Sequence, residues 1–96
     1  MNHLSVAIAD DNQKILDLLE KVIGTDQELD LVGKAKNGEE MCRIIKEKNP
    51  DVVLLDLIMP KMDGLTVMDQ INQDKSVSIR PYFIVITAVG QEKITE

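Results

Sequence analysis

The chain has 96 residues, of which 44% are hydrophobic and 29% charged, and its net charge at pH 7 is −6. This length allows one domain with a single core, and the composition is that of a globular protein, not of a disordered chain. The negative charge argues against nucleic-acid binding, because contact with phosphates needs clustered Lys and Arg. The sequence shows neither a membrane-spanning segment nor a secretory signal, so we expect a cytoplasmic location without membrane attachment.

The first expected element is a strand over residues 4–9, and a helix follows it. Asp11 or Asn12 is the expected N-cap of this helix, and Gly24 lies near its end. The helix is amphipathic because its apolar residues recur at i, i+3, i+4 and i+7. These residues are Ile15, Leu18, Leu19 and Val22.

A weaker strand is expected over 29–35, and a second helix begins at 37–40, with acidic residues in its first turn and lysines in its last. Asn49 and Pro50 end this helix. The run 52–55 is continuously apolar, which is typical of a central strand covered on both faces. Cys42, the only cysteine, falls in the apolar pattern of the second helix and is interpreted as a buried small hydrophobic residue.

Pro60 and Gly64 lie in the next turn, where Gly64 is expected to supply backbone freedom near a helix start. Apolar positions over 65–71 predict the third helix. The apolar run 83–86 predicts a fourth strand, and residues 91–96 are expected to open a fourth helix. This alternation of strands and helices predicts an α/β fold. Its sheet is parallel, with right-handed crossovers and helices on both faces.

Polar residues follow three of the expected strands directly. Asp10 and Asp11 follow the first strand, Asp56 the third and Thr87 the fourth. Because the carboxyl ends of parallel strands meet at one edge of the sheet, these side chains should converge there. Clustered carboxylates imply a cation or a protonated member, and oxygen ligands without His or Cys favour Mg²⁺, with Mn²⁺ or Ca²⁺ possible, over zinc. The plainer alternative is that the acids only cap a helix and end a strand.

An ionised Asp can accept a phosphoryl group as an acyl phosphate when a metal screens the incoming anion. Asp56 is the best candidate because it ends the most buried strand. Asp11 would hold Mg²⁺ directly and Asp10 would assist through water. The Thr87 hydroxyl could then donate to a phosphoryl oxygen, although β-propensity alone also explains a threonine at a strand end.

Three motifs together resemble the receiver domains of two-component response regulators: 10–12, 50–64 and 86–88. The resemblance covers nearly the whole chain and implies a flavodoxin-like, doubly wound parallel sheet with strand order 2-1-3-4-5. It also implies the site residues, which are Asp56 as phosphoacceptor, Asp10 and Asp11 as metal-site acids, the backbone carbonyl of Ile58 as a further Mg²⁺ ligand, and Thr87 as the switch hydroxyl.

Segments 6–12, 46–51 and 87–92 look more narrowly like the phosphoacceptor domain of the sporulation master regulator of spore-forming Firmicutes. This resemblance implies a phosphorelay, with a histidine kinase or phosphotransferase protein as the donor. The output would be transcription regulation, in sporulation, through a DNA-binding effector domain outside this chain.

Receiver domains continue with a fifth strand that ends in Lys-Pro and with a last helix, and the sequence stops at Glu96 before either. We therefore expect residues 1–96 to form one receiver domain that is incomplete at its C-terminus. Strand 83–86 then becomes an apolar sheet edge, which is prone to pair with another copy of the chain or to swap.

Two other functions compete with the phosphorylation switch. A Mg²⁺-dependent phosphatase with an aspartyl nucleophile commonly carries a second Asp two residues later, where this chain has Ile58. A pure interaction module would show no site-specific response to Mg²⁺. We expect the chain not to be an enzyme, beyond Mg²⁺-dependent self-phosphorylation and dephosphorylation.

Overall fold

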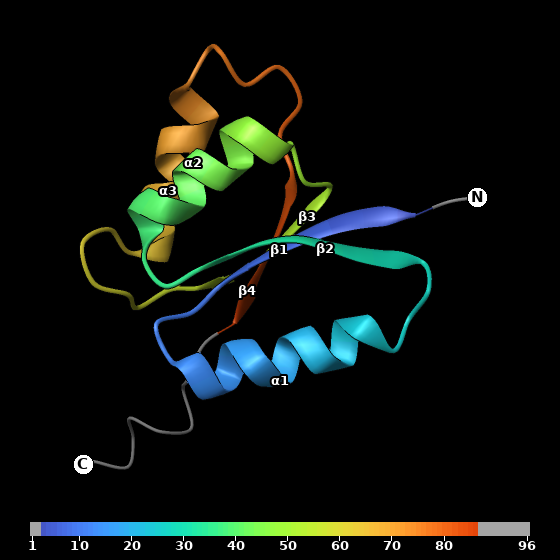
Figure 1. Cartoon of the computed structure of the whole chain (residues 1–96). Coiled ribbons are helices and arrows are strands. Elements are labelled where there is room, and N and C mark those ends of the chain that lie inside the picture. Colours follow the sequence, from blue (N-terminus) through green and yellow to red (C-terminus); the bar gives the residue numbers. More distant parts are fainter. Residues whose placement is uncertain (1–2, 87–96) are drawn as a thin grey trace.

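The computed structural model describes residues 3–86. In this part of the chain a parallel sheet lies between two helical layers, with α1 on one face and α2 and α3 on the other (Figure 1). The elements are β1 (Leu4–Ala9), α1 (Gln13–Gly24), β2 (Leu29–Ala35), α2 (Gly38–Lys48), β3 (Val52–Asp56), α3 (Gly64–Gln73) and β4 (Tyr82–Ile86). Every strand and helix expected in this range is present, whereas the helix expected over 91–96 lies outside the described residues.

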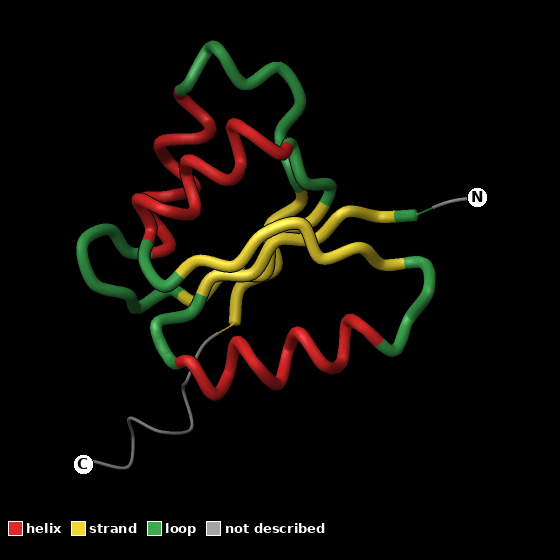
Figure 2. Tube along the Cα trace, in the orientation of Figure 1, coloured by secondary structure: helices red, strands yellow, loops and turns green. Residues whose placement is uncertain are grey.

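The strands pair in the order β2-β1-β3-β4, and all three pairings are parallel. Figure 2 shows the four strands side by side, with helices above and below. The order confirms the expected 2-1-3-4 arrangement and the α/β fold. It also places the ends of β1 and β3 next to each other, because Ala9 of β1 lies in register with Leu55 of β3.

The central strands are buried on both faces, so successive residues contribute to two different cores. Val6 and Ile8 of β1 pack toward α1, whereas Ala7 and Ala9 pack toward α2 and α3. Among residues 3–86, the core under α1 contains four buried residues, and the core under α2 and α3 contains twelve. This burial on both faces explains why β1 and β3 lack the polar alternation of a strand with one wet face.

Side-chain caps set where the three helices begin. Asn12, Asn37 and Asp63 each accept a hydrogen bond from a backbone N–H in the first turn of α1, α2 and α3 respectively. At the end of α2, Asn49 adopts a left-handed conformation with φ of 47°, which asparagine tolerates well. Among the described helices, none is both long and apolar enough to cross a membrane.

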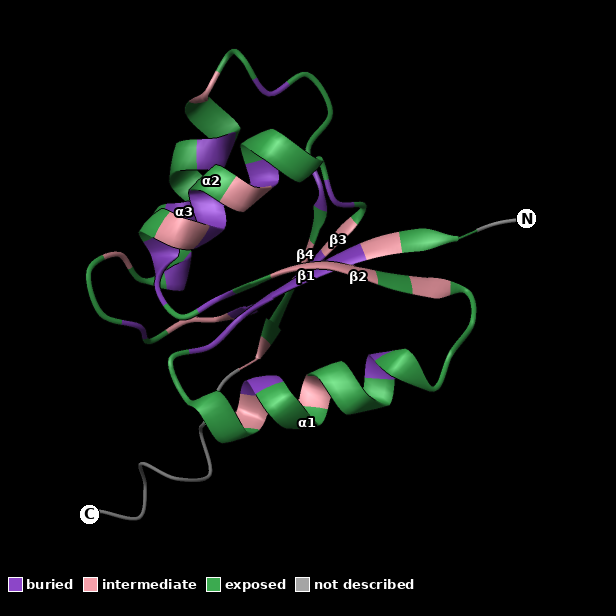
Figure 3. Ribbon diagram, viewed as in Figure 1, coloured by how far each residue is buried: buried purple, intermediate pink, exposed green. Residues whose placement is uncertain are grey.

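Strand β4 is the least covered strand of the sheet. Tyr82 is 79% exposed and Ile84 is 52% exposed, and Figure 3 shows most of β4 in the colour of exposed residues. Within the described part of the chain β4 pairs only with β3. The strand expected over 83–86 is thus present, and among the described residues it lies at the edge of the sheet.

Candidate functional site

Three carboxylates meet at the carboxyl edge of the sheet. One carboxylate oxygen from each of Asp10, Asp11 and Asp56 lies within 4.8 Å of the others. Asp10 and Asp11 follow β1, and Asp56 is the last residue of the adjacent strand β3. The predicted convergence of the three acids is thus observed, while Thr87 lies outside the described residues.

Asp10 is buried and held by hydrogen bonds at the turn between β1 and α1. Its backbone N–H donates to the carbonyl of Ala35 at the end of β2, at 3.0 Å. Its Oδ1 accepts from the backbone N–H of Asn12, at 2.9 Å. Because Asn12 itself caps α1, Asp11 is not the cap, and its exposed side chain takes part in the acidic cluster.

Asp56 is half-buried, and its surroundings disfavour its charge. Burial raises the pKa of the Asp56 carboxyl, and the charges of Asp10 and Asp11 raise it further, although a hydrogen bond from the Ile58 backbone N–H to Oδ1, at 3.2 Å, acts in the opposite direction. Burial is the larger cause, and repulsion from the two neighbouring acids adds to it. The ionised form of Asp56 is therefore less favoured than that of a freely exposed Asp side chain, and a neighbouring positive charge would favour it.

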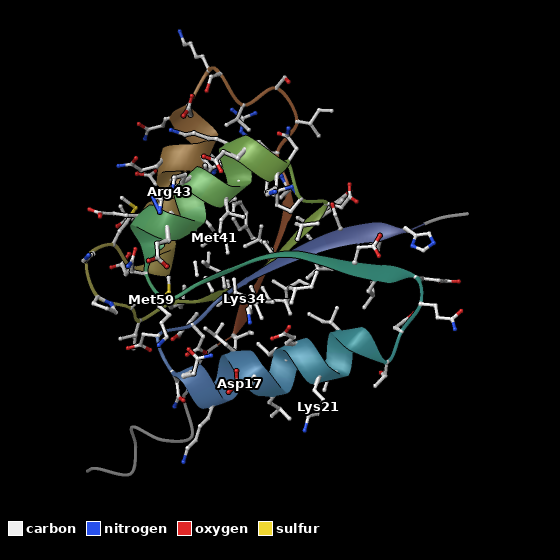
Figure 4. The ribbon with its side chains drawn as sticks, in the orientation of Figure 1. Asp17, Lys21, Lys34, Met41, Arg43 and Met59 are labelled. Atoms are coloured by element: carbon white, nitrogen blue, oxygen red, sulfur yellow. The ribbon has the colours of Figure 1, made fainter. Side chains whose placement is uncertain are left out.

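The segment after Asp56 leads from β3 to α3. The side chain of Ile58 is 72% exposed, whereas Met59 is buried in the core that α2 and α3 share with the sheet. Figure 4 labels Met59 and also Met41, a residue of α2 that belongs to the same core. At the far end of the segment, the Gly64 backbone N–H donates to the Leu57 carbonyl at 3.0 Å, which closes the loop.

Gly64 is required for a different reason from the one expected. Its φ is not positive, so it does not supply an unusual backbone conformation. A Cβ atom at this position would instead lie 2.5 Å from the Asp56 carbonyl oxygen, closer than real Cβ atoms approach other heavy atoms. The left-handed residue of the loop is Lys61, with φ of 66°, and nothing in the sequence pattern distinguished it.

The donor set fits a hard divalent cation. The cluster offers carboxylate oxygens only, and Mg²⁺, Mn²⁺ and Ca²⁺ prefer such ligands. Three clustered carboxylates, one buried and one half-buried, also need a compensating charge. Ile58, whose backbone carbonyl is the fourth expected ligand, lies two residues beyond Asp56 on the same loop.

Residues 6–96 match the family model described as the response regulator receiver domain. The chain belongs to this family. Proteins of the family generally bind Mg²⁺ at an acidic pocket, and they interact with histidine kinases or phosphotransfer proteins. The acidic cluster of this receiver domain lies at the same edge of the sheet that the sequence motifs predicted.

Solved structures support the same assignment. The signal receiver domain of NarL from Mycobacterium tuberculosis is 27% identical, with a TM-score of 0.82, and the match covers 92% of this chain and 68% of that one. The CheX-CheY-BeF3-Mg²⁺ complex from Borrelia burgdorferi matches at 30% identity and a TM-score of 0.78, over 95% of this chain and 66% of that one. A DNA-binding response regulator of the LuxR family from Staphylococcus aureus matches at 28% identity and a TM-score of 0.78, over 96% and 74%.

These similarities show that the fold is the flavodoxin-like α/β fold of receiver domains. The chain spans about two thirds to three quarters of the length of the matched structures. One feature of the site was not anticipated from the sequence, namely a close contact between the loop after Asp56 and the first turn of α2. The two segments are far apart in the sequence, and no motif links them.

Proposed function

We propose that this receiver domain is a phosphorylation switch in which Asp56 accepts a phosphoryl group from a phosphohistidine with the help of Mg²⁺. The observation that carries the proposal is the convergence of Asp10, Asp11 and Asp56 within 4.8 Å at the carboxyl edge of the sheet. The donor is a histidine kinase or a phosphotransferase protein. The chain acts as a phosphoacceptor and not as an enzyme with a turnover substrate.

The transfer step is a displacement at phosphorus. A carboxylate oxygen of Asp56 attacks the phosphorus of the phosphoimidazole, and a new O–P bond forms as the P–N bond breaks. The electron pair of the broken bond stays on the imidazole nitrogen, which takes up a proton from water. Burial and the neighbouring acids raise the pKa of Asp56, so a cation beside the carboxylate should favour its ionised form and promote this step.

Asp10, Asp11, Asp56 and the backbone carbonyl of Ile58 would hold the Mg²⁺ ion. When bound, the ion neutralises the charge shared by the carboxylates and the phosphoryl oxygens. The hydrogen bond from Asn12 to Asp10 fixes one Asp10 oxygen, so Asp10 would act through water while Asp11 and Asp56 bind the ion. Mn²⁺ or Ca²⁺ could occupy the same oxygens.

Thr87 follows β4 directly in the sequence and is the proposed switch hydroxyl. The neighbouring residue Ile86 lies in register with Asp56 across the β3–β4 pair, which brings this end of β4 beside the phosphoacceptor. A hydroxyl there would donate to a phosphoryl oxygen once Asp56 is modified.

The output of the switch is proposed from the relatives. A match to a DNA-binding response regulator of the LuxR family supports a DNA-binding effector outside this chain. The proposed location is the cytoplasm. The role in a sporulation phosphorelay rests on the sequence segments alone. A second copy of the chain is proposed as a partner through the exposed apolar edge of β4.

The test is to incubate the protein with Mg²⁺ and acetyl phosphate and to follow its intact mass. We expect one phosphoryl adduct that is absent without Mg²⁺ and absent in Asp56→Asn. Asp17→Asn, a change of an exposed residue on α1, is the matched control and should keep the adduct. An adduct that persists in Asp56→Asn, or none on the wild-type protein, would reject Asp56 as the acceptor.

A further inference from the structure

The loop that connects β3 to α3 contains a strained turn. The Met62 backbone N–H donates to the Pro60 carbonyl at 2.7 Å, across Lys61, whose φ is 66°. A hydrogen bond between residues i and i+2 around a central residue with positive φ defines a rare and strained type of γ-turn. Such a conformation persists only where surrounding contacts hold it.

The first turn of α2 supplies such a contact. A Cβ atom on Gly38, the first residue of α2, would collide with the carbonyl oxygen of Met62 and would lie 2.7 Å from the Met62 Cβ. One turn further along α2, the Cys42 Sγ lies 3.7 Å from the Met62 Sδ. The residue that ends the strained turn therefore packs against α2 through both its backbone and its side chain.

Gly38 is needed at this point for space and not for its backbone freedom. Its φ is not positive, so an L-residue could adopt the same backbone conformation. The obstacle is the backbone of Met62, which cannot rotate away as the end of a flexible side chain could. By comparison, the three atoms nearest to a Cβ on Gly33 would belong to the Ile44 side chain, and a Cβ on Gly24 would meet nothing within 4 Å.

The helix is better anchored than the loop. Met41 and Ile45 of α2 are 0% and 1% exposed in the core, and Asn37 caps the first turn by accepting from the Glu40 backbone N–H at 2.9 Å. The loop has exposed residues at Ile58, Pro60, Lys61 and Asp63. If Gly38 gains a methyl group, we therefore expect the loop to move and the helix to stay.

We infer that the first turn of α2 positions the metal-binding loop, with Gly38 as the positioning residue. The inference rests on the proposed Mg²⁺ site, because the same loop carries Ile58, whose N–H donates to Asp56 Oδ1 and whose carbonyl is a proposed ligand. A shift at Met62 is transmitted along the three residues that separate it from Ile58. The contact thus links the first turn of α2 to the geometry of the phosphoacceptor.

The test compares Gly38→Ala with Gly24→Ala by titrating Mg²⁺ into each protein and measuring the dissociation constant. Urea unfolding of each variant checks that the protein is folded under the conditions of the Mg²⁺ titration. We expect Gly38→Ala to bind Mg²⁺ more weakly by about tenfold or more, the loss typical when a group that orients a ligand is removed. Gly24→Ala should bind as the wild type does. An unchanged affinity in folded Gly38→Ala would overturn the inference.

A second measurement uses the wild-type protein and does not depend on any variant folding. If α2 affects Mg²⁺ binding, Mg²⁺ binding must also affect α2, because coupling is reciprocal. Mg²⁺ should therefore shift the backbone amide NMR signals of Gly38, Cys42 and Ile58, and the three titration curves should give the same dissociation constant. Amides at the far end of α2, such as Lys48, are the internal reference and should not follow. If Ile58 responds and Gly38 does not, the inference fails. If no residue responds to Mg²⁺, the proposed metal site itself is rejected.

Discussion

The carbonyl oxygen of Asp56 occupies the space that a side chain on Gly64 would need, since a Cβ there would lie 2.5 Å away. The two residues are joined by a closed loop, in which the Gly64 N–H donates to the Leu57 carbonyl at 3.0 Å. Any larger residue at position 64 must therefore displace the end of β3 or the start of α3. The end of β3 carries Asp56, the proposed phosphoacceptor.

The first prediction follows from this contact. Gly64→Ala should lower the free energy of unfolding by about 1–3 kcal/mol, as overpacking of a well-filled site does, even though alanine favours helices. It should also slow the formation of the phosphoryl adduct on the folded protein. Urea unfolding and intact-mass kinetics measure the two effects. The control is Gly24→Ala at the end of α1, where a Cβ would meet no atom within 4 Å. Equal stability of the two variants would contradict a steric conflict between residue 64 and the Asp56 carbonyl.

Asp56 makes stability depend on pH in a defined direction. Its pKa is raised in the folded, metal-free protein, mainly by burial, so the folded state binds its proton more tightly than the unfolded state does. Stability should therefore fall as the pH rises from the unfolded-state pKa through the raised folded-state pKa. Asp56→Asn should be more stable than the wild type at neutral pH without Mg²⁺, and this advantage should disappear in acid.

Thermal unfolding of the wild type and Asp56→Asn, at neutral pH and at a pH below the usual Asp range, measures this effect. Asp17→Asn is the control for loss of one negative charge from an exposed position. Mg²⁺ should reduce or reverse the neutral-pH advantage, because the ion stabilises only the wild-type site. An Asp56→Asn protein that is less stable than the wild type at neutral pH would contradict this interpretation.

A third prediction concerns the ends of α2 and α3. The pKa of Asp74 is well below its usual range, because the Ser76 hydroxyl donates to Oδ1 at 2.6 Å and the Lys46 ammonium lies 2.9 Å from Oδ2. A lowered pKa in the folded state gives stability that is present at neutral pH and lost as the pH falls through the Asp74 pKa.

Asp74→Asn should therefore unfold at a lower urea concentration than the wild type at neutral pH, with the difference shrinking in strong acid. Lys46→Met, which removes only the partner charge, should give a smaller change, since the hydrogen bonds from Ser76 remain. A larger effect of Lys46→Met than of Asp74→Asn would assign the lowered pKa to the ion pair instead.

The fourth prediction tests the strained turn at Lys61. Lys61→Gly should raise the free energy of unfolding by up to about 1 kcal/mol, because glycine adopts positive φ without steric strain. Asn49→Gly is the matched control, since Asn49 has φ of 47° but asparagine already tolerates this region. Urea unfolding of both variants measures the change in the free energy of unfolding. An increase for Asn49→Gly that equals or exceeds the increase for Lys61→Gly would argue against strain in the loop.

Local sequence signals predicted much of this fold because they act over a few residues. Asn12 and Asn37 were expected at or next to helix starts, and both are N-caps. The apolar runs before Asp10 and Asp56 predicted central strands, and parallel pairing then brought the acids together. These features depend on spacing and polarity alone, which a sequence displays directly.

Features that depend on distant contacts were missed or misread. The collision that requires glycine at position 38 involves Met62, on a segment beyond β3, and no periodicity reports such a contact. Gly64 was recognised as important but for its conformational freedom, because only the fold shows how near the Asp56 carbonyl lies. The positive φ of Lys61 was hidden because lysine is not a typical residue for that conformation.

The difference between the two cores implies that the proposed ion stabilises α1 against local opening. In the described part of the chain, Asp10 and Asp11 lead into α1, which packs on a core of four buried residues, whereas Asp56 leads toward the face of the sheet whose core contains twelve. Helix α1 should therefore open more often than the rest and exchange its amide hydrogens faster. A cation bound to all three carboxylates would connect the segment that leads into α1 with the end of β3. Binding of the cation should therefore slow amide hydrogen exchange in α1 more than in α2 or α3.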